Sequence, residues 1–294
     1  MLPGPPSECL PMFHHRAVPY LQALSEGVIA SHTLKLFGIG ESAMEAQLRD
    51  EMNAMSNPTL APYAKEGECE LRITAKAADE ESARALIAPV EERLRARFGP
   101  LIYGADVPSL EAAVFQLLKE KGLTLGCAES CTGGLIAQRI TSVPGSSEVF
   151  GYGFVTYWEA AKARLVGVEP DVIAKYNVVS APVAAQMALG AAQAAGAEIG
   201  ISVTGVAGPT GGDALRPVGT VYLGAARGET VYVKKLSVSR PDRALVRARA
   251  AQAALELALR LAQGKVPAGT EPLARDAQHS AEALDKLNEV FLGH

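Results

Sequence analysis

Three short polar runs each follow an apolar segment of this chain, and together they could form a reactive site. The first, AESCTGGL (128–135), leads into a helix-like stretch. Ser130 is a candidate nucleophile there, because the N–H groups of Thr132, Gly133 and Gly134 at a helix start could hold the oxyanion that forms when a carbonyl is attacked. The alternative is that Ser130 only caps the following helix.

A serine hydroxyl needs a base before it can attack, and the five histidines of the chain lie far in sequence from these runs. The second run, TYWEAAK (156–162), offers Lys162 as that base, provided that burial keeps its amine neutral. Tyr157 could relay a proton or orient the serine and the lysine. The simpler interpretation makes Lys162 a surface lysine. Cys131 is a rival nucleophile that a core position would equally explain.

The third run, TGVAGPTGG (204–212), could cradle a phosphate or a sugar. Thr204 offers a hydroxyl, and the loop that contains Gly205 and Gly208 offers backbone N–H groups. No Gly-Lys-Ser/Thr follows, so the run does not match the phosphate loop of ATPases, and a long turn is the alternative. Arg243 could bind an anionic ligand through two hydrogen bonds, or be an ordinary surface charge.

The elements that must position these runs alternate between strands and helices. Apolar strand patterns occupy 123–127, 149–157 and 199–204, and a hairpin is predicted at 218–226 and 230–238. Helical spacing is found at 109–121, 135–143, 159–166, 182–195 and 242–263. This order predicts a three-layer α/β/α domain on a mixed sheet. Because ligand sites collect at the carboxyl ends of strands, we expect the three runs to line one pocket.

The rest of the chain divides at residues that interrupt both patterns. Residues 25–104 alternate as a small α+β module, and the glycine, aspartate and proline of 104–108 predict a connection to the domain at 108–263. Residues 1–24 begin as a proline-rich loop and continue as a helix interrupted at Pro11 and Pro19. The polar tail, 264–294, is expected to be peripheral or partly disordered.

Composition narrows the functional class. The 28 Lys and Arg against 32 Asp and Glu give a net charge of −4, which provides no basic face on which to expect a nucleic-acid partner. No apolar run approaches the roughly 20 residues that span a bilayer. Four scattered cysteines and the lack of a signal-peptide pattern predict a reduced, cytoplasmic protein. No cysteine-histidine cluster typical of zinc sites occurs, so we expect no metal and no cofactor.

The chain resembles the CinA family of competence/damage-inducible proteins. The matching runs are AESCTGG, PGSS, GFVTYWEAAKARLVGV, TGVAGP and PVGTVY, which occur in order between residue 108 and about 262. The resemblance implies metal-independent hydrolysis of the carboxamide of nicotinamide mononucleotide to nicotinate mononucleotide and ammonia. It makes Ser130 the nucleophile, Lys162 the base and Tyr157 its partner.

The resemblance also implies the residues that hold the substrate and its phosphate. They are Thr132, Gly133, Gly134, Thr204, Gly205, Gly208 and Arg243. The family's Gly-Asp-Arg run before the last helix reads Arg-Pro-Asp-Arg here, so the assignment of Arg243 rests on a weaker match.

The N-terminal third carries the resemblance further. LFGIGES and NPTLAPYAKEGECELRITAKA resemble a middle domain described as KH-like, and LPGPPSE resembles the end of a molybdopterin-binding-like first domain. We therefore expect residues 1–24 to be a remnant of that domain. Its exposed apolar surface would favour a homodimer or another partner. The alternative function is that of a non-catalytic protein in competence or DNA repair, with a recombinase as its partner.

Overall fold

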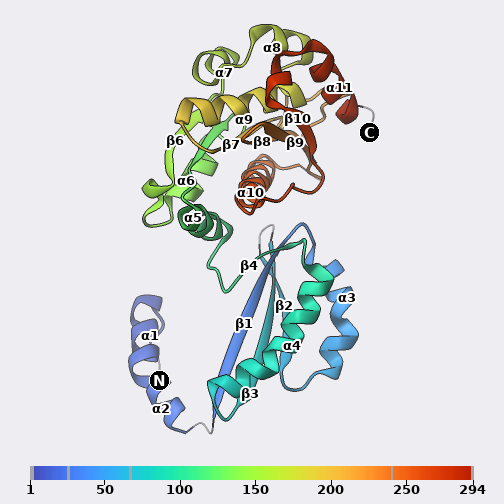
Figure 1. Cartoon of the computed structure of the whole chain (residues 1–294). Coiled ribbons are helices and arrows are strands. Elements are labelled where there is room, and N and C mark those ends of the chain that lie inside the picture. Colours follow the sequence, from blue (N-terminus) through green and yellow to red (C-terminus); the bar gives the residue numbers. More distant parts are fainter. Residues whose placement is uncertain (1–2, 25–26, 66–67, 240, 293–294) are drawn as a thin grey trace. The chain divides into compact units, whose positions relative to one another are not determined.

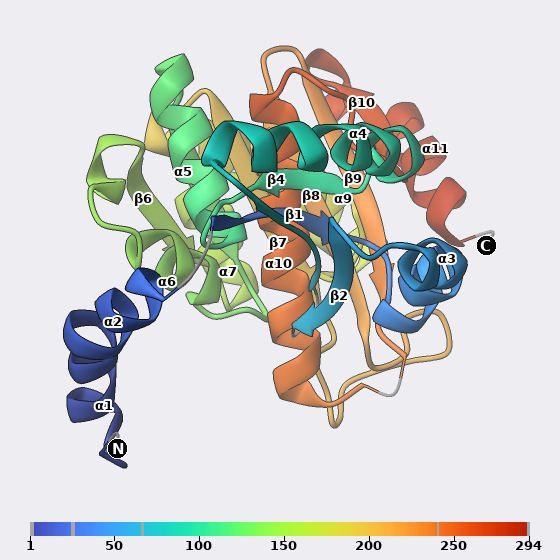
Figure 2. The same cartoon turned by 90° about the horizontal axis from the view of Figure 1, so that it is seen from below.

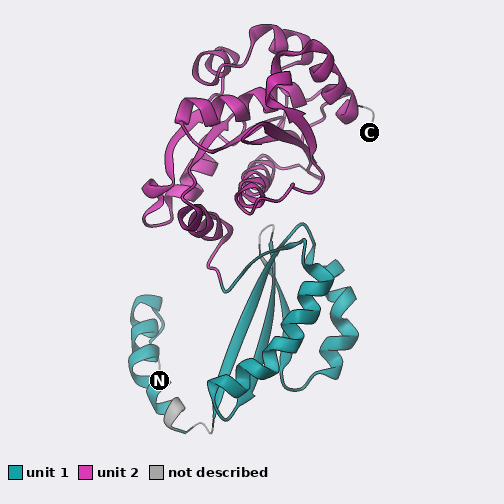
Figure 3. Cartoon of the chain, viewed as in Figure 1, with its two compact units in different colours: residues 1–106 teal, residues 107–294 magenta. Residues whose placement is uncertain are grey.

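The computed structural model describes residues 3–24, 27–65, 68–239 and 241–292. It has two compact units, residues 1–106 and 107–294, each with its own sheet and its own buried core (Figure 3). The boundary between Asp106 and Val107 lies inside the connection predicted at 104–108. In the part of the chain that is described, no helix has the length and apolar character needed to cross a membrane.

Unit 1 begins with a continuous helical segment. Its parts are α1 (Pro6–Met12), the π-helical turn η1 (Phe13–Ala17) and α2 (Val18–Ala23). The predicted interruptions do not occur, because Pro11 lies inside α1 and Pro19 inside α2. Neither α1 nor η1 buries a side chain, and Leu10, Tyr20 and Leu24 are exposed.

A four-stranded antiparallel sheet in the order β2-β3-β1-β4 forms the rest of unit 1. The strands are β1 (Val28–Phe37), β2 (Thr59–Lys65), β3 (Glu68–Ala77) and β4 (Ile102–Ala105), and the helices are α3 (Glu41–Ala54) and α4 (Glu80–Phe98). Side chains of both helices and of the sheet share one core. The alternating run at 68–77 is therefore a strand, as predicted.

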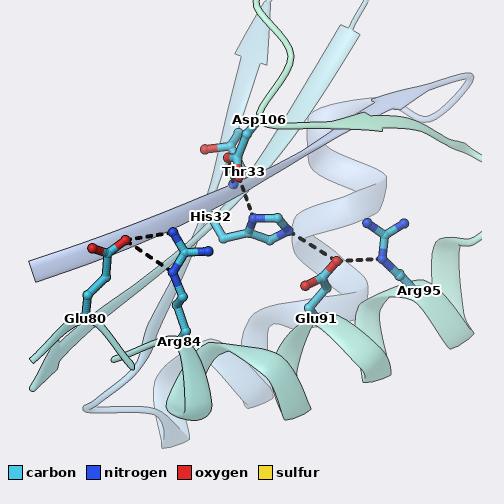
Figure 4. Close-up of polar contacts among 7 residues, drawn as sticks. All are labelled: His32, Thr33, Glu80, Arg84, Glu91, Arg95 and Asp106. Carbon is cyan, nitrogen blue, oxygen red and sulfur yellow. Dashed lines mark hydrogen bonds and ion pairs between the residues drawn. The ribbon is translucent and has the colours of Figure 1, made fainter. Parts of the chain in front are cut away.

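His32 connects three elements of unit 1 (Figure 4). Its Nδ1 lies 2.6 Å from Asp106 Oδ2, and its Nε2 lies 3.2 Å from Glu91 Oε1 on α4. Asp106 Oδ1 also accepts from the Thr33 N–H at 2.8 Å, so the end of β4 is tied to β1. Burial raises the pKa of Glu91, but the hydrogen bond from Arg95 and the charge interactions with His32 and Arg95 outweigh it, and the pKa lies below its usual value.

Unit 2 contains a six-stranded mixed sheet in the order β10-β9-β8-β7-β5-β6. Its strands are β5 (Leu125–Glu129), β6 (Phe150–Val155), β7 (Ile199–Gly205), β8 (Thr220–Arg227), β9 (Thr230–Ser237) and β10 (Glu271–Ala274). β5 pairs in parallel with both β6 and β7, while the remaining pairs are antiparallel. The predicted mixed sheet and its hairpin are confirmed.

Helices cover both faces of this sheet, which makes the three layers predicted from the sequence. They are α5 (Leu110–Lys121), α6 (Leu135–Thr141), α7 (Glu159–Val166), α8 (Pro170–Tyr176), α9 (Ala181–Ala195), α10 (Arg243–Ala262) and α11 (Ala281–Leu292). α9 lies on one face with α7, α8 and α11 against it, and α10 lies on the other with α5 and α6 (Figures 1 and 2). α9 approaches so closely that a Cβ at Gly200 or Gly224 would meet its backbone carbonyls.

The C-terminal tail is part of the domain, which corrects the expectation of a peripheral or partly disordered segment. β10 adds to the sheet beside β9, and α11 buries Leu284, Leu287 and Phe291 in the core under α9. The Phe291 ring packs edge-on against Tyr222 of β8, with 5.9 Å between ring centroids. A short amphipathic helix contributes little by itself, and here tertiary packing holds it in place.

Strand directions bring four loop starts to one edge of the sheet. β5, β6 and β7 are parallel, and β9, reached through antiparallel β8, runs in the same direction as β7. Their carboxyl ends therefore lie at the same edge. The segments that follow them contain the three polar runs and the start of α10.

Candidate active site

Ser130 lies immediately after β5, in a tight turn. Its N–H donates to Val203 O of β7 at 3.0 Å, and its carbonyl accepts from the Gly133 N–H at 3.0 Å. Gly133 and Gly134 have φ values of +59° and +96°, a conformation that glycine adopts without steric cost. The two glycines thus allow the chain to leave the strand, turn at Ser130 and enter α6 within five residues.

Lys162 meets Ser130 from α7. Its side chain is fully buried, and Nζ donates to Ser130 Oγ at 3.0 Å and to the Thr156 carbonyl at 2.6 Å. Burial lowers the pKa of the ammonium to about 8, although the charges of Cys131 and Glu159 act in the opposite direction. About a tenth of the amine is then neutral at pH 7, far more than for an ordinary lysine, and the neutral form has a lone pair on Nζ that can accept the hydroxyl proton of Ser130.

Glu129 holds the start of α6 next to Ser130, a role that sequence reasoning missed. Its side chain is fully buried; Oε2 accepts from the N–H groups of Gly134 and Ile136 at 3.0 Å, and Oε1 from Ala137 at 2.9 Å. A carboxylate at this position satisfies the free donors of α6 and complements the helix dipole. The only signal in the sequence was an acidic residue at the end of an apolar strand.

The N–H groups that are free to hold an oxyanion differ from the expected set of Thr132, Gly133 and Gly134. The N–H groups of Gly133 and Gly134 bond within the protein, to Ser130 and Glu129. Among the described residues, the N–H groups of Cys131 and Thr132 donate to no other residue. Both residues are buried, and the Thr132 hydroxyl also has no partner in the described part of the chain. The unused donors of the turn thus lie directly after Ser130.

Tyr157 and Arg243 form a second group at the same sheet edge. Arg243 lies at the start of α10, donates through Nη1 to the Gly208 carbonyl at 2.8 Å and through Nη2 to the Tyr157 hydroxyl at 3.1 Å. The structure thus brings together three of the predicted site residues. The Tyr157 hydroxyl accepts from Arg243, whereas the resemblance implies Tyr157 as the partner of Lys162.

Two members of the predicted phosphate loop serve the fold. The Thr204 hydroxyl is buried and donates to the Val178 carbonyl at 2.7 Å. Gly205 closes β7 where a Cβ would meet the Thr220 carbonyl and the Val221 backbone of β8. Gly208 stays next to Arg243 through its carbonyl oxygen, with a φ of +82°. Gly208 is therefore the residue of this loop that contacts the exposed Arg243–Tyr157 pair.

Two protein-family models match the chain, one in each unit. The Damage-inducible protein CinA KH domain matches residues 31–104, and the CinA C-terminal domain matches residues 107–262, more than half of the chain. Both matches agree with the resemblance found in the sequence motifs.

Curated relatives extend the similarity across both units. The CinA-like protein of Kosmotoga olearia is 46% identical over 260 residues, which are 88% of this chain and 63% of that protein. The CinA-like protein of Dictyoglomus thermophilum is 49% identical over 240 residues, 81% of this chain and 58% of that protein. The chain thus spans less than two thirds of the length of these relatives.

Solved structures match over about half of the chain. The competence/damage inducible protein CihA of Agrobacterium tumefaciens is 37% identical with a TM-score of 0.51, covering 53% of this chain and 97% of that one. A competence-damaged protein (CinA) superfamily protein of Escherichia coli is 36% identical with a TM-score of 0.50, covering 52% and 88%. From these matches and the fold, the chain belongs to the CinA family.

Proposed function

We propose that unit 2 hydrolyses the carboxamide of nicotinamide mononucleotide, giving nicotinate mononucleotide and ammonia. The observation that carries this proposal is the 3.0 Å contact between Ser130 Oγ and the buried Lys162 amine, whose pKa is lowered to about 8. A hydroxyl next to a largely desolvated amine is a nucleophile next to its base. A protein that only binds a partner has no need of this pair.

Acylation would begin when Ser130 Oγ attacks the carboxamide carbon while Lys162 Nζ takes the hydroxyl proton. The oxygen of the tetrahedral intermediate would accept from the N–H groups of Cys131 and Thr132, the donors left unused in the turn. Both residues are buried, and exclusion of water makes such hydrogen bonds most effective. Lys162 then returns its proton to the nitrogen as the C–N bond breaks, so that ammonia leaves and an ester on Ser130 remains.

Deacylation reverses these roles. A water molecule attacks the ester carbon and gives a proton to the neutral Lys162, and the same donors again hold the oxyanion. When the bond to Ser130 Oγ breaks, Lys162 returns the proton to that oxygen. The serine is free again and Lys162 is neutral for the next turnover, while the carboxylic acid product releases the second proton of the water to solvent and leaves as the carboxylate.

Arg243 supports recognition of a phosphorylated substrate. Its guanidinium is exposed, lies at the sheet edge that carries Ser130, and uses Gly208 and Tyr157 as partners. A phosphate that offers two oxygens is a stronger acceptor for this fork than a carbonyl and a phenol. We therefore assign Arg243 to the phosphate and Tyr157 to holding Arg243 in place.

The reaction is proposed to take place in a reducing compartment, the cytoplasm. Cys69, Cys127 and Cys131 are buried as free thiols, and burial raises the pKa of Cys127 and, to about 11, that of Cys131. A thiol with a raised pKa is a poor nucleophile near neutral pH, which favours Ser130 over Cys131 as the attacking group.

The names of the relatives point to competence and DNA damage, and a recombinase or a second copy of the chain as partner is compatible with the same chemistry.

The proposal is tested by incubating the purified chain with nicotinamide mononucleotide and measuring ammonia and nicotinate mononucleotide. Ser130→Ala should lower kcat by about 10³-fold or more, the scale of losing a nucleophile. Ser147→Ala, at an exposed serine in the same unit, is the matched control and should leave kcat unchanged. Full activity of Ser130→Ala would reject the assigned nucleophile, and an inactive wild-type chain would reject the substrate.

A further inference from the structure

A side chain of α10 binds two carbonyl groups of the Ser130 turn. Arg247 donates through Nε to the Cys131 carbonyl at 3.2 Å and through Nη2 to the Thr132 carbonyl at 2.8 Å. Two hydrogen bonds from one planar guanidinium to two successive carbonyls fix the orientation of both peptide groups.

The orientation of the first of these peptides decides where its N–H points. In a trans peptide the C=O and the N–H point in opposite directions. The Cys131 carbonyl points to Arg247, so the Thr132 N–H points away from α10. Lys162 reaches Ser130 from α7, on the opposite face of the sheet from α10 (Figure 1). The Thr132 N–H is therefore directed to the side on which the Ser130–Lys162 pair lies.

The same peptide is the central peptide of a turn, which has two common orientations. The Gly133 N–H donates to the Ser130 carbonyl, which makes residues 130–133 a β-turn with Cys131 and Thr132 at its centre. The two common turn types differ by rotation of the central peptide through about 180°, and the rotated form needs a positive φ at Thr132, which a β-branched residue resists. A rotated peptide would place the Cys131 carbonyl, an acceptor, where an oxyanion needs a donor. The two hydrogen bonds from Arg247 hold the observed orientation, in which the Cys131 carbonyl points to α10.

We propose that Arg247 is a positioning residue for the reaction at Ser130, keeping the N–H group of Thr132 directed at the oxyanion. This rests on the proposed function of the Ser130–Lys162 pair. Arg247 itself does not touch the reacting atoms. Its contribution is specific to the transition state, because the donor it orients acts on charge that develops only there.

The test compares Arg247→Lys and Arg247→Ala with Arg249→Ala, an exposed arginine on the same helix as the matched control. Lysine keeps the charge and the stem but cannot form the fork. We expect kcat for nicotinamide mononucleotide to fall about 10-fold in Arg247→Lys and about 100-fold in Arg247→Ala, with KM changed less than about threefold. Arg249→Ala should match the wild type, and the melting temperature of Arg247→Lys should stay within a few degrees of it.

A second readout does not depend on the substrate. A fluorophosphonate probe forms a bond from Ser130 Oγ to phosphorus while the P–F bond breaks; fluoride leaves and Lys162 takes the hydroxyl proton. The phosphoryl oxygen uses the same donors, so the rate of Ser130 modification, followed by mass spectrometry, should fall in parallel with kcat. A wild-type chain that is labelled but releases no ammonia rejects the proposed substrate, and the labelling rates still test Arg247.

The results that overturn the inference are equally specific. A folded Arg247→Lys variant with the wild-type kcat and labelling rate shows that the fork is not needed. An increase in KM with kcat unchanged would mean that Arg247 contacts the substrate directly, and would also contradict a positioning role. If Arg247→Ala does not fold, the comparison between Arg247→Lys and Arg249→Ala decides the question alone.

Discussion

The pH dependence of the reaction follows directly from the environment of Lys162. The neutral amine is the active form, and burial lowers the pKa of its ammonium to about 8. The neutral fraction is then about 3% at pH 6.5 and about 97% at pH 9.5. We expect kcat/KM to rise about 30-fold between these values and to level off above pH 9. A lysine with its ordinary pKa would instead give a rise of about 1,000-fold without a plateau.

The assay is the initial rate of ammonia release from nicotinamide mononucleotide at low substrate concentration, in buffers of constant ionic strength. The range starts at pH 6.5 so that the substrate phosphate, with a pKa near 6, is mostly doubly charged throughout. A rate that stays constant from pH 6.5 to 9.5, or rises without a plateau, would refute Lys162 as a base with a lowered pKa.

A neighbouring carboxylate supplies a matched pair of variants for this profile. The charge of Glu159 raises the pKa of Lys162, against the larger effect of burial. Removing that charge in Glu159→Gln should move the midpoint of the profile to lower pH, because the ammonium loses a stabilising neighbour. Glu120→Gln, at an exposed position on α5, should leave the midpoint unchanged. A midpoint that moves to higher pH in Glu159→Gln would contradict the electrostatic reasoning.

Two further outcomes are expected. Arg243→Ala should raise KM for nicotinamide mononucleotide about 10-fold or more and leave KM for nicotinamide riboside, which lacks the phosphate, nearly unchanged. A double-mutant cycle with Tyr157→Phe should be non-additive, because the two side chains share a hydrogen bond. Additive effects would mean that the two residues act independently. Phe291→Ala should destabilise unit 2 by about 3–4 kcal/mol in denaturant unfolding, because its ring is buried against Tyr222. The exposed Leu215→Ala is its control, and an equally small effect of both would mean that α11 is not part of the core.

Much of the fold could be predicted because its signals are local. Alternation at 68–77, apolar runs at the strands of unit 2, and glycines after β5 are all patterns within ten residues. The parallel strands and the connecting helices then require the polar runs to share a sheet edge. Local patterns also explain the errors: the polar composition of 264–294 concealed the few apolar side chains with which α11 joins the core.

The contacts that complete the site could not be predicted in this way. Arg247 lies more than a hundred residues from the carbonyls it binds, and Arg243 lies 86 residues from Tyr157. No spacing rule connects such positions, since their meeting depends on the order of the strands and on the placement of α10. Glu129 is close in sequence to its partners, but its side chain reaches past Ser130 to α6 only because the turn folds back.

The sequence by itself determined the family, the mixed α/β architecture and the candidate pair of Ser130 and Lys162, because these depend on residue types at short, regular spacing. Tertiary structure decided how each group is used. Burial lowered the pKa of Lys162, and hydrogen bonding to Glu129 withdrew the Gly134 donor from the site. Desolvation and backbone hydrogen bonding arise only when distant segments pack together, so no local pattern in the sequence encodes them.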